Sequence, residues 1–327
     1  MTRLILPDAA QATTPMNVPA VFFHHPCADG FTAAWAFWTK FPDWEYIAAT
    51  HGDLADMVST LNEIKGSWMG EDIYFLDICP QKDALTQVLD LVHTGGKKVY
   101  VLDHHKSALD FLTDMEHPAL VKFCDNERSG AGLAWDYVYG DSEPRPDLVN
   151  FVEDRDLWRF KLEDTRVFAS FLFSLEYDFM RWDLVHRDLQ VEEHREAIFE
   201  QGEAITRKHY KDTAELVANG HDWQVIGGWE VPTINAPYFY ASELGHALCK
   251  EVPFAAVWYE RQGQRHYSLR SEENVGLDVS KIAQMYGGGG HRHAAGFSIA
   301  CPVLNDLSEY VIGPDGVPYS ETRRDEA

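Results

Sequence analysis

The sequence predicts a two-domain α/β protein, in which a doubly wound domain with a parallel sheet is joined by a linker helix to a smaller α/β domain. The first half of the chain alternates short apolar runs with longer helical patterns, which is the rhythm of a parallel sheet covered on both faces. A long polar segment with helical periodicity follows it. With 327 residues, the chain also exceeds the usual size of one compact domain.

Five apolar runs in the first half are typical of buried strands, and three segments between them have a periodicity near that of a helix. The runs cover residues 20–25, 44–50, 72–77, 98–103 and 120–124, and the helical segments cover residues 31–40, 82–93 and 107–114. Ligands of such sheets gather beyond the carboxyl ends of the strands. Polar residues that follow these runs are therefore candidates for a functional site.

The polar segment over residues 184–216 predicts one long amphipathic helix with charge on most of its circumference. Beyond it, apolar runs at 223–227, 254–260, 266–271 and 296–300 alternate with helical patterns at 242–249 and 279–285. We therefore expect a tail over 1–17, a first domain over 18–183, the linker helix over 184–216, a second domain over 217–312 and a tail over 313–327.

The composition favours a small target and a reducing compartment. Fifty-two acidic and 28 basic residues give a net charge of −24, which repels polyanions, so we expect no long duplex nucleic acid as a partner. Such charge equally suits general solubility or a salty cell interior. Five scattered cysteines form no disulfide or zinc pattern, and no segment resembles a signal peptide or a membrane span. We expect a cytoplasmic protein with no membrane contact.

Polar residues follow three of the predicted strands. They are the run from His24 to Gly30, Asp77, and the run Asp103-His104-His105. Any one of them alone suits a helix cap or a turn. Carboxylates combined with imidazoles at three strand ends instead favour a pair of divalent ions, which need hard oxygen ligands and imidazole in one cavity.

A second candidate site is the run from Gly287 to Gly290, which is followed by His291, Arg292 and His293. Consecutive glycines let the backbone approach a ligand and turn its amides toward an anion. A glycine run is also typical of flexible loops, but this one lies between a helical pattern and a strand, where a linker is not expected. Residues 129–132 open a helical run, so their amides suit either an anion or a plain N-cap.

Taken in order, these motifs resemble the DHH/DHHA1 phosphoesterase superfamily, named for the Asp-His-His run, over about residues 20–300. The resemblance implies a doubly wound DHH domain, a linker helix and a DHHA1 domain that together hydrolyse phosphate esters with two divalent ions. Members of the superfamily include nanoRNases and other oligoribonucleases. The implied substrate is small: a short oligonucleotide, a dinucleotide, 3′-phosphoadenosine phosphate or inorganic polyphosphate.

The resemblance also implies roles for single residues. His25, Asp29 and His104 match metal ligands and Asp77 the aspartate that bridges two ions, while Asp103 would orient His104 and His105 would face the substrate phosphate. The last metal ligand is Asp154 or Asp156, and the Asp-x-Trp pattern of relatives favours Asp156. In the second domain the implied substrate contacts are Arg270, Gly288, Gly289, Gly290, His291 and His293.

One position departs from the family pattern. The first motif usually reads His-x-Asp-x-Asp-Gly, and Cys27 stands where its first aspartate is expected. A thiolate ligand would favour zinc or iron over manganese, whereas a water ligand would leave Cys27 a small buried residue. We expect manganese, with Zn²⁺, Fe²⁺ and Mg²⁺ as alternatives. The alternative to an enzyme is a catalytically weakened nucleotide-binding protein on the same fold, and homodimerisation stays open.

Overall fold

The computed structural model describes residues 18–50, 53–56, 61, 71–300, 310–312 and 318–320. These residues form two compact units that divide between Asn219 and Gly220. The tails expected over residues 1–17 and 313–327 lie outside the described residues, apart from a short strand at Pro318–Ser320. The finer domain boundaries stay a prediction.

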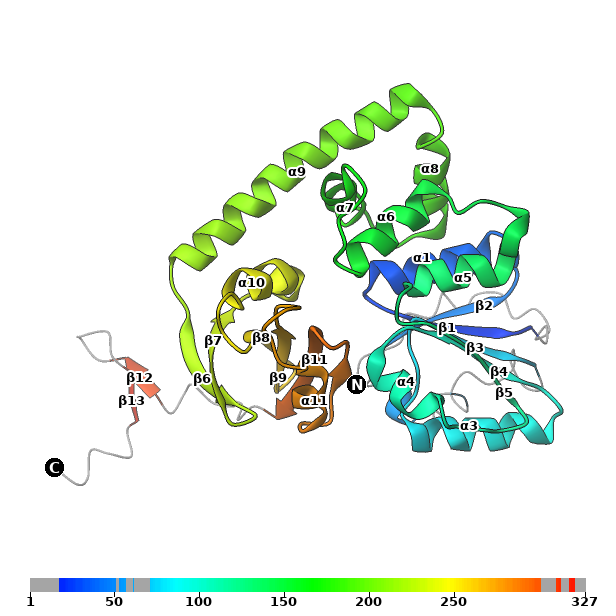
Figure 1. Ribbon diagram of the computed structural model, residues 1–327, viewed down its shortest axis with the longest axis horizontal. Helices are drawn as coiled ribbons and strands as arrows, with labels where there is room; N and C mark the ends of the chain where they lie inside the picture. Colours follow the sequence, from blue (N-terminus) through cyan, green and yellow to red (C-terminus); the bar gives the residue numbers. More distant parts are fainter. Residues whose placement is uncertain are drawn as a thin grey trace. The chain divides into compact units, whose positions relative to one another are not determined.

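The first unit is built on a five-stranded sheet in which every strand runs parallel to its neighbours, as the sequence predicted (Figure 1). The strand order is β2-β1-β3-β4-β5, and each strand lies within one of the predicted apolar runs. The strands are β1 (Ala20–His24), β2 (Glu45–Ala49), β3 (Ile73–Leu76), β4 (Val99–Asp103) and β5 (Leu120–Cys124).

Helices cover both faces of this sheet. Side chains alternate along β1, so that Val21 and Phe23 join one hydrophobic cluster while Ala20 and Phe22 join the other. Helices α1 and α5 to α9 contribute to the first cluster, and α3 and α4 to the second. The helices are α1 (Ala28–Trp38), α3 (Lys82–Thr94), α4 (Lys106–Leu112), α5 (Gly130–Tyr139), α6 (Asp147–Asp156), α7 (Thr165–Leu172), α8 (Phe179–Asp188) and α9 (Glu192–Ala218).

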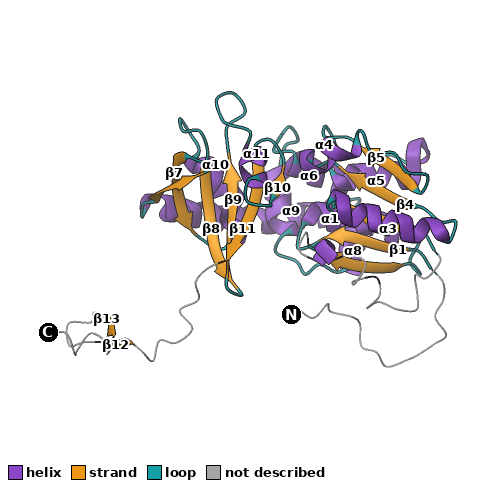
Figure 2. Cartoon of the chain, turned by 90° about the horizontal axis from the view of Figure 1, so that it is seen from below, coloured by secondary structure: helices purple, strands orange, loops and turns teal. Residues whose placement is uncertain are grey.

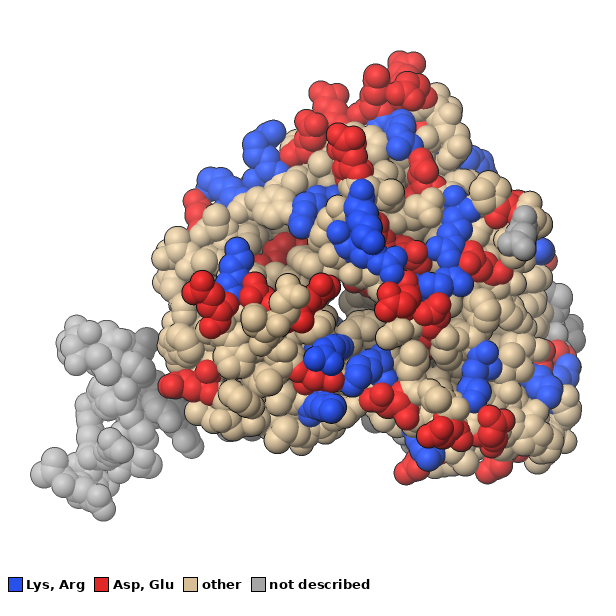
Figure 3. All heavy atoms as spheres, in the orientation of Figure 1, with Lys and Arg blue, Asp and Glu red and all other residues tan. Residues whose placement is uncertain are grey.

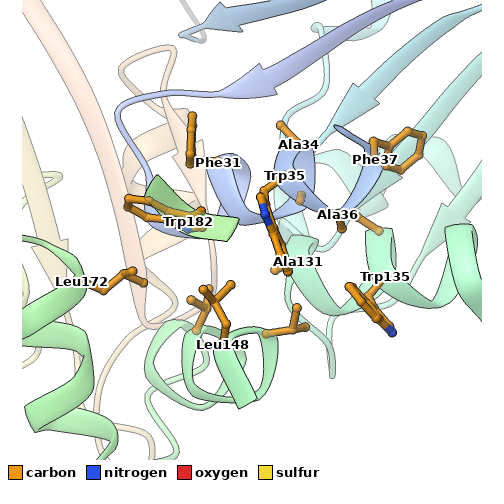
Figure 4. Close-up of a cluster of buried hydrophobic side chains, with 14 of the residues drawn as sticks. Phe31, Ala34, Trp35, Ala36, Phe37, Ala131, Trp135, Leu148, Leu172 and Trp182 are labelled. Atoms are coloured by element: carbon orange, nitrogen blue, oxygen red, sulfur yellow. The ribbon is translucent and has the colours of Figure 1, made fainter. Parts of the chain in front are cut away.

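Helix α1 is the central element of the first cluster and is buried from Asp29 to Phe37. Its rings pack against side chains of α5, α6 and α8, as Figure 4 shows for Phe31, which lies beside Trp182 of α8. The indole N–H of Trp182 donates to Oγ1 of Thr32 at 3.0 Å, which satisfies both polar groups inside the cluster. The dense packing fixes the start of α1, where Asp29 lies.

The single helix predicted over residues 184–216 is wrong, because the structure has two helices there. Helix α8 begins at Phe179, where the side chain of Asp178 accepts from the backbone N–H of Arg181, and ends at Asp188. Helix α9 then runs from Glu192 to Ala218, with two glutamates in its first turn. The break lets Leu189 be buried in the first cluster, so burial outweighs the continuous polar pattern.

The second unit is built on a six-stranded sheet with the order β10-β11-β9-β8-β7-β6 (Figure 2). All its neighbouring strands are antiparallel except β7 and β8. Strand β7 was not expected from the sequence, since Pro232 in its middle weakens the strand pattern. The strands are β6 (Asp222–Ile226), β7 (Trp229–Asn235), β8 (Ala255–Arg261), β9 (Gln264–Arg270), β10 (Gly289–Gly290) and β11 (Ala294–Ala300).

Two helices pack on this second sheet. Helix α11 (Val279–Gln284) shares a hydrophobic cluster with Phe254, Ala256 and Leu269, while α10 (Ala241–Leu248) packs against β8 and β9. Strands β12 (Tyr310–Ile312) and β13 (Pro318–Ser320) pair with each other, and short 3-10 turns lie at Asp53–Asp56, Gly140–Ser142 and Tyr238–Tyr240. Within the described residues, no helix is both long and apolar enough for a bilayer.

Candidate metal centre

Three neighbouring strands of the first unit lead into polar residues at one edge of the sheet. Strand β1 ends at His24, β3 is followed by Asp77, and β4 ends at Asp103 with His104 and His105 behind it. Because β1, β3 and β4 are adjacent and parallel, their carboxyl ends lie side by side. The side chains that follow them form two groups.

The first group surrounds the ring of His104, and we call it the His104 group. Nε2 of His104 lies 3.0 Å from Oδ1 of Asp77, 3.5 Å from Oδ2 of Asp29 and 3.6 Å from Oδ2 of Asp156. His104, Asp29 and Asp77 are at most 2% exposed. Three carboxylates around one imidazole nitrogen leave the group with more negative than positive charge.

Burial and charge crowding shift the pKa values of this group. Burial lowers the pKa of His104, but a hydrogen bond to Asp77 and the surrounding carboxylates outweigh it and raise the pKa to about 10. Burial raises the pKa of Asp29 well above its usual value, and the charges of Asp77 and Asp156 raise it further. Without a bound cation, the protonated ring of His104 is the counter-charge of these carboxylates.

The second group, which we call the His24 group, joins His24, Asp77 and His105. Oδ2 of Asp77 lies 3.3 Å from Nδ1 of His24, and Oδ1 lies 3.8 Å from Nδ1 of His105. The ligand atoms of these three residues lie within 4.8 Å of one another, as do those of Asp29, His104 and Asp156. Asp77 is therefore shared by both groups, which is the arrangement that a bridging carboxylate requires.

Asp103 holds the ring of His105. Its Oδ1 accepts hydrogen bonds from Nδ1 of His105 at 2.7 Å and from the backbone N–H groups of His104 and His105. The expectation that Asp103 orients the ring of His104 is therefore wrong. Residues two apart in an extended chain point to the same side, which brings the ring of His105, and not that of His104, to this carboxylate.

The N-terminus of α5 holds Asp29 in place. The carboxylate of Asp29 accepts from the backbone N–H groups of Gly130 at 2.6 Å and Ala131 at 2.9 Å. Ser129 caps the same helix by accepting from the N–H of Gly132. Residues 129–132 therefore form an N-cap and also bind an anion, as the two alternatives from the sequence proposed. The bound anion is the carboxylate of Asp29 in the same chain. A Cβ atom at Gly130 would come within 2.5 Å of Cβ of Asp77, so only glycine allows this approach.

The two aspartates of α6 have different surroundings. Asp154 accepts from the backbone N–H groups of Lys161 and Leu162 and from Oγ1 of Thr165, so it fastens the loop that follows α6. Asp156, two residues further along the helix, points to another side and lies at His104. The structure brings Asp156 into the His104 group and leaves Asp154 outside it.

In the second unit, Arg270 is the last residue of β9 and pairs with Ala294 of β11. Nη1 of its guanidinium donates to the carbonyl oxygen of Leu269 at 2.8 Å, and Nη2 donates to Oγ of Ser242 at 3.0 Å. The guanidinium is thus held in a defined orientation. His291 and His293 lie in the turn between β10 and β11, next to this end of β9.

The glycine run forms an ordered hairpin strand rather than a linker. Gly289 and Gly290 make up β10 and pair with β11. A Cβ atom at Gly288 would come within 2.1 Å of the carbonyl oxygen of Gly296, so the close approach made by this glycine is to the chain's own strand. His293 is also held internally, since its Nδ1 lies 3.0 Å from Oγ of Ser271. Contact of these residues with a substrate stays a prediction.

Comparisons with known proteins agree with this arrangement. The DHHA1 domain model matches residues 242–312. The oligoribonuclease NrnB of Bacillus subtilis is 26% identical over 260 residues, which cover 73% of this chain and 62% of that protein. A solved DHH domain, described as a member of the s1p family of ribosomal proteins, superimposes with a TM-score of 0.52 at 16% identity and covers 86% of this chain and 82% of its own. The chain belongs to the DHH/DHHA1 superfamily.

A viral relative is similar over a larger part of this DHH/DHHA1 chain. The uncharacterized protein R106 of Acanthamoeba polyphaga mimivirus is 29% identical over 301 residues, covering 87% of this chain and 68% of that protein. The chain spans less than two thirds of the length of the oligoribonuclease. We refer below to the first unit as the DHH unit and to the second as the DHHA1 unit.

The two histidines of the first DHH motif have different surroundings. The ring of His25 packs against Tyr177, with centroids 5.1 Å apart, and its buried Nδ1 has no hydrogen-bond partner among the described residues. His24 lies beside Asp77. The two rings lie on opposite faces of the chain, since His25 continues the face of Phe23. The role of His25 as a metal ligand stays a prediction, and the structure adds His24 as a candidate. Because the residues from Ala20 to Phe23 are all buried, the sequence of β1 held no signal that could have found His24.

Cys27 lies at the start of α1 as its N-cap residue, without a side-chain capping bond. Burial raises the pKa of its thiol well above the usual value, and the charges of Asp77, Asp156 and Asp29 raise it further. The thiol is therefore close enough to the His104 group to sense its carboxylates, and it is protonated when no cation is bound.

The residues of the DHH unit fit divalent cations. Both groups combine carboxylate oxygens with imidazole nitrogens, the donor set that suits manganese, zinc and iron. Oδ2 of Asp156 is buried and makes no hydrogen bond within the described part of the chain. The repulsion among Asp29, Asp77 and Asp156 is of the kind that a bound cation relieves.

Proposed function

We propose that the chain is a divalent-metal-dependent phosphoesterase that hydrolyses short oligonucleotides or other small nucleotides. One observation carries this proposal: two groups of ligand atoms at the carboxyl edge of the sheet share the carboxylate of Asp77. The relationship to an oligoribonuclease supports the substrate class. Manganese as the metal and a cytoplasmic location are the finer parts of the proposal.

In this account Asp29, Asp77, His104 and Asp156 would hold one cation, and Asp77 with His24 would hold a second. Bound there, divalent cations would supply charge withdrawal from phosphoryl oxygens and a more nucleophilic water at neutral pH. The N-terminus of α5 keeps Asp29 oriented, because both of its oxygens accept backbone hydrogen bonds. The protein thereby presents its ligands in a fixed arrangement before the ions bind.

His105 acts on the substrate in this proposal. Burial lowers its pKa, but the charge and hydrogen bond of Asp103 outweigh burial and raise it, so the ring keeps a proton at Nδ1 toward Asp103. The second ring nitrogen, Nε2, then donates to a phosphoryl oxygen or to the leaving oxygen. Asp103 is a positioning residue for this step.

The DHHA1 unit supplies substrate contacts. The guanidinium of Arg270 is fixed by Leu269 and Ser242, and a planar fork of N–H donors suits two phosphate oxygens. We assign the hairpin residues from Gly288 to Gly290, together with His291 and His293, to the remaining part of the nucleotide. The net charge of −24 favours a short substrate over a long strand.

A panel of substrates tests the proposal. Wild-type protein should release mononucleotides from two- to five-nucleotide RNA with Mn²⁺, and Asp77→Asn, which keeps the size of the side chain, should reduce this by at least about 100-fold, since even indirect metal partners contribute 10- to 100-fold. Turnover with 3′-phosphoadenosine phosphate alone would change the substrate class. Undiminished turnover in the Asp77→Asn variant would overturn the centre.

One observation favours a second function, a nucleotide-binding protein with weakened chemistry. Cys27 stands where the resemblance to the family implies an aspartate, and its thiol is protonated in the cation-free protein. Tight binding of a dinucleotide with one ion per chain and no turnover would support this alternative. Two ions per chain with release of mononucleotide would exclude it.

A further inference from the structure

The loop that follows Asp156 concentrates basic and aromatic residues. Between residues 155 and 166 the chain carries four basic side chains, although acidic residues outnumber basic ones in the whole sequence. We call this segment the arginine–aromatic loop. Figure 3 shows Lys and Arg side chains gathering over α6 and α7, the two helices that the loop connects. Its members in this argument are Arg155, Trp158, Phe160, Lys161 and Arg166.

The loop is held in one conformation. Asp154 accepts from the backbone N–H groups of Lys161 and Leu162 and from the hydroxyl of Thr165. Trp158 and Phe160 have φ angles of 56° and 49°, in the left-handed region that bulky residues rarely adopt. The structure thus retains an unfavourable backbone conformation that sets the place of these two rings, as is common at functional sites.

The rings of the loop are covered by guanidinium groups. The guanidinium carbon of Arg155 lies 4.5 Å from the ring centre of Trp158, and that of Arg166 lies 3.4 Å from the ring centre of Phe160 and 5.7 Å from that of Trp158. A guanidinium stacked on a ring keeps the N–H donors at its edge directed outward. The ring faces are therefore in use, and the loop offers donors for an anion rather than a surface for a nucleobase.

Two cations of the loop have no carboxylate partner among the described residues. Arg166 is exposed and donates from Nη1 to the hydroxyl of Tyr210 at 2.9 Å, and Lys161 is exposed without a side-chain contact. By contrast, Arg159 of the same loop lies 3.8 Å from Glu127 and 3.9 Å from Glu153. Other exposed cations of the described residues, such as Lys250 and Lys281, also lack an ion pair. What distinguishes Arg166 is that its guanidinium is held over the ring of Phe160, which leaves donors at its edge for an anion.

The loop is also linked to the His104 group. Arg155 is the chain neighbour of Asp156, whose Oδ2 lies 3.6 Å from Nε2 of His104. The stacked contacts then run from Arg155 over Trp158 to Arg166. Arg166 is thus connected to Asp156 through the stacked side chains of one loop, and Lys161 follows Phe160 in the same loop.

We propose that Arg166 and Lys161 form a second phosphate site, which binds a phosphate of the substrate other than the one that is hydrolysed. This inference rests on the proposed function, because it takes the His104 group as the place of hydrolysis. The site would favour substrates with two or more phosphates, such as 5′-phosphorylated di- and trinucleotides. Substrates with a single phosphodiester group would gain nothing from it.

Paired substrates test the second phosphate site. We expect Arg166→Ala and Lys161→Ala each to raise KM for a 5′-phosphorylated trinucleotide by about 10-fold, as expected for loss of a charge-assisted hydrogen bond. Hydrolysis of bis(p-nitrophenyl) phosphate, which has one phosphate, should change less than about 2-fold, within the scatter of surface substitutions. Arg166→Lys should recover part of the loss. Arg187→Ala on α8, which removes an arginine paired with Asp183, is the matched control and should have no effect.

A binding measurement separates this inference from the proposed function. A fluorescent trinucleotide with hydrolysis-resistant linkages is titrated into the protein with Mn²⁺ at several salt concentrations. Each of the two alanine variants should reduce the slope of log affinity against log salt by about 0.7, the value for one phosphate of a single strand. Equal losses on both substrates, an unchanged salt slope, or no binding by wild type would overturn the second phosphate site. Altered salt slopes without any turnover would contradict the proposed function and leave this site in place.

Discussion

The candidate sites of the two units differ in whether their charged groups have partners of opposite charge or hydrogen-bond partners within the chain. In the DHH unit, Asp29, Asp77 and Asp156 converge on the ring of His104, and no basic side chain other than histidine lies among the described ligand groups. In the DHHA1 unit, the guanidinium of Arg270 has oxygen partners within the chain. The site of the DHH unit carries negative charge that a cation would neutralise. The site of the DHHA1 unit is a packed surface whose shape is already set.

The largest effect is expected within α6 of the DHH unit. Asp156→Asn should weaken Mn²⁺ binding and turnover by at least about 100-fold while the fold is retained. Asp154→Asn should leave Mn²⁺ affinity nearly unchanged but lower the free energy of unfolding by about 2 kcal/mol, because an amide replaces a carboxylate that accepts three hydrogen bonds. Calorimetric Mn²⁺ titration and urea unfolding measure the two effects. The reverse pattern would exchange the roles of the two aspartates.

The DHHA1 unit should respond to changes of shape. Gly288→Ala places a Cβ atom against the carbonyl oxygen of Gly296, and we expect a loss of about 3 kcal/mol of folding free energy, at the upper end for overpacking because the clash is with backbone. Gly287→Ala is the matched variant: it meets no atom within 4 Å, but its φ of 77° is unfavourable for alanine, at about 1 kcal/mol. Urea unfolding measures both, and Mn²⁺ affinity should stay constant. Equal stability of the two variants would contradict the packed hairpin.

Cys27 tests how the charge imbalance of the DHH unit selects its metal. Cys27→Asp should tighten Mn²⁺ binding by about 10-fold, because a hard carboxylate suits this ion better than a thiol. With Co²⁺, the wild-type protein should show a thiolate-to-metal absorption band that Cys27→Ser lacks. If wild type and Cys27→Ser have the same spectrum, the thiol is no ligand and a water molecule takes its place.

The smallest effect concerns Asp136 of the DHH unit, whose negative charge is paired with Arg145 and Arg128. Burial raises the pKa of Asp136, but its hydrogen bonds with Arg145 and the charge of Arg128 outweigh burial and lower it. A lowered pKa stabilises the fold above the unfolded value of about 3.9, and this contribution is lost as pH falls through the folded value. Asp136→Asn should therefore cost under about 1 kcal/mol near neutral pH. The difference from wild type should shrink below about pH 4 in urea unfolding, and a constant difference would contradict the account.

Most of the parallel sheet could be predicted because its three central strands, β1, β3 and β4, are almost entirely buried. Such strands are short apolar runs, which the sequence shows clearly. Strand β7 escaped prediction because it contains Pro232, and α8 merged with α9 because tertiary burial of Leu189 decides where the helices separate.

The site was predicted at the level of strand ends but not of side-chain directions. Asp77 and His104 follow directly from the motif order, whereas the position of His24 beside Asp77 depends on which face of β1 its ring occupies. The same reason explains why Asp103 contacts the ring of His105. Asp154 and Asp156 differ only in their direction around α6, which a sequence of two nearby aspartates does not specify.

The central claim is that Asp77 is shared by two cation sites. The most direct test is calorimetric titration of metal-free protein with Mn²⁺, wild type against Asp77→Asn. The account predicts two ions per chain for wild type and the loss or strong weakening of both sites in the variant. One ion or none in wild type, or two undisturbed ions in Asp77→Asn, would contradict it.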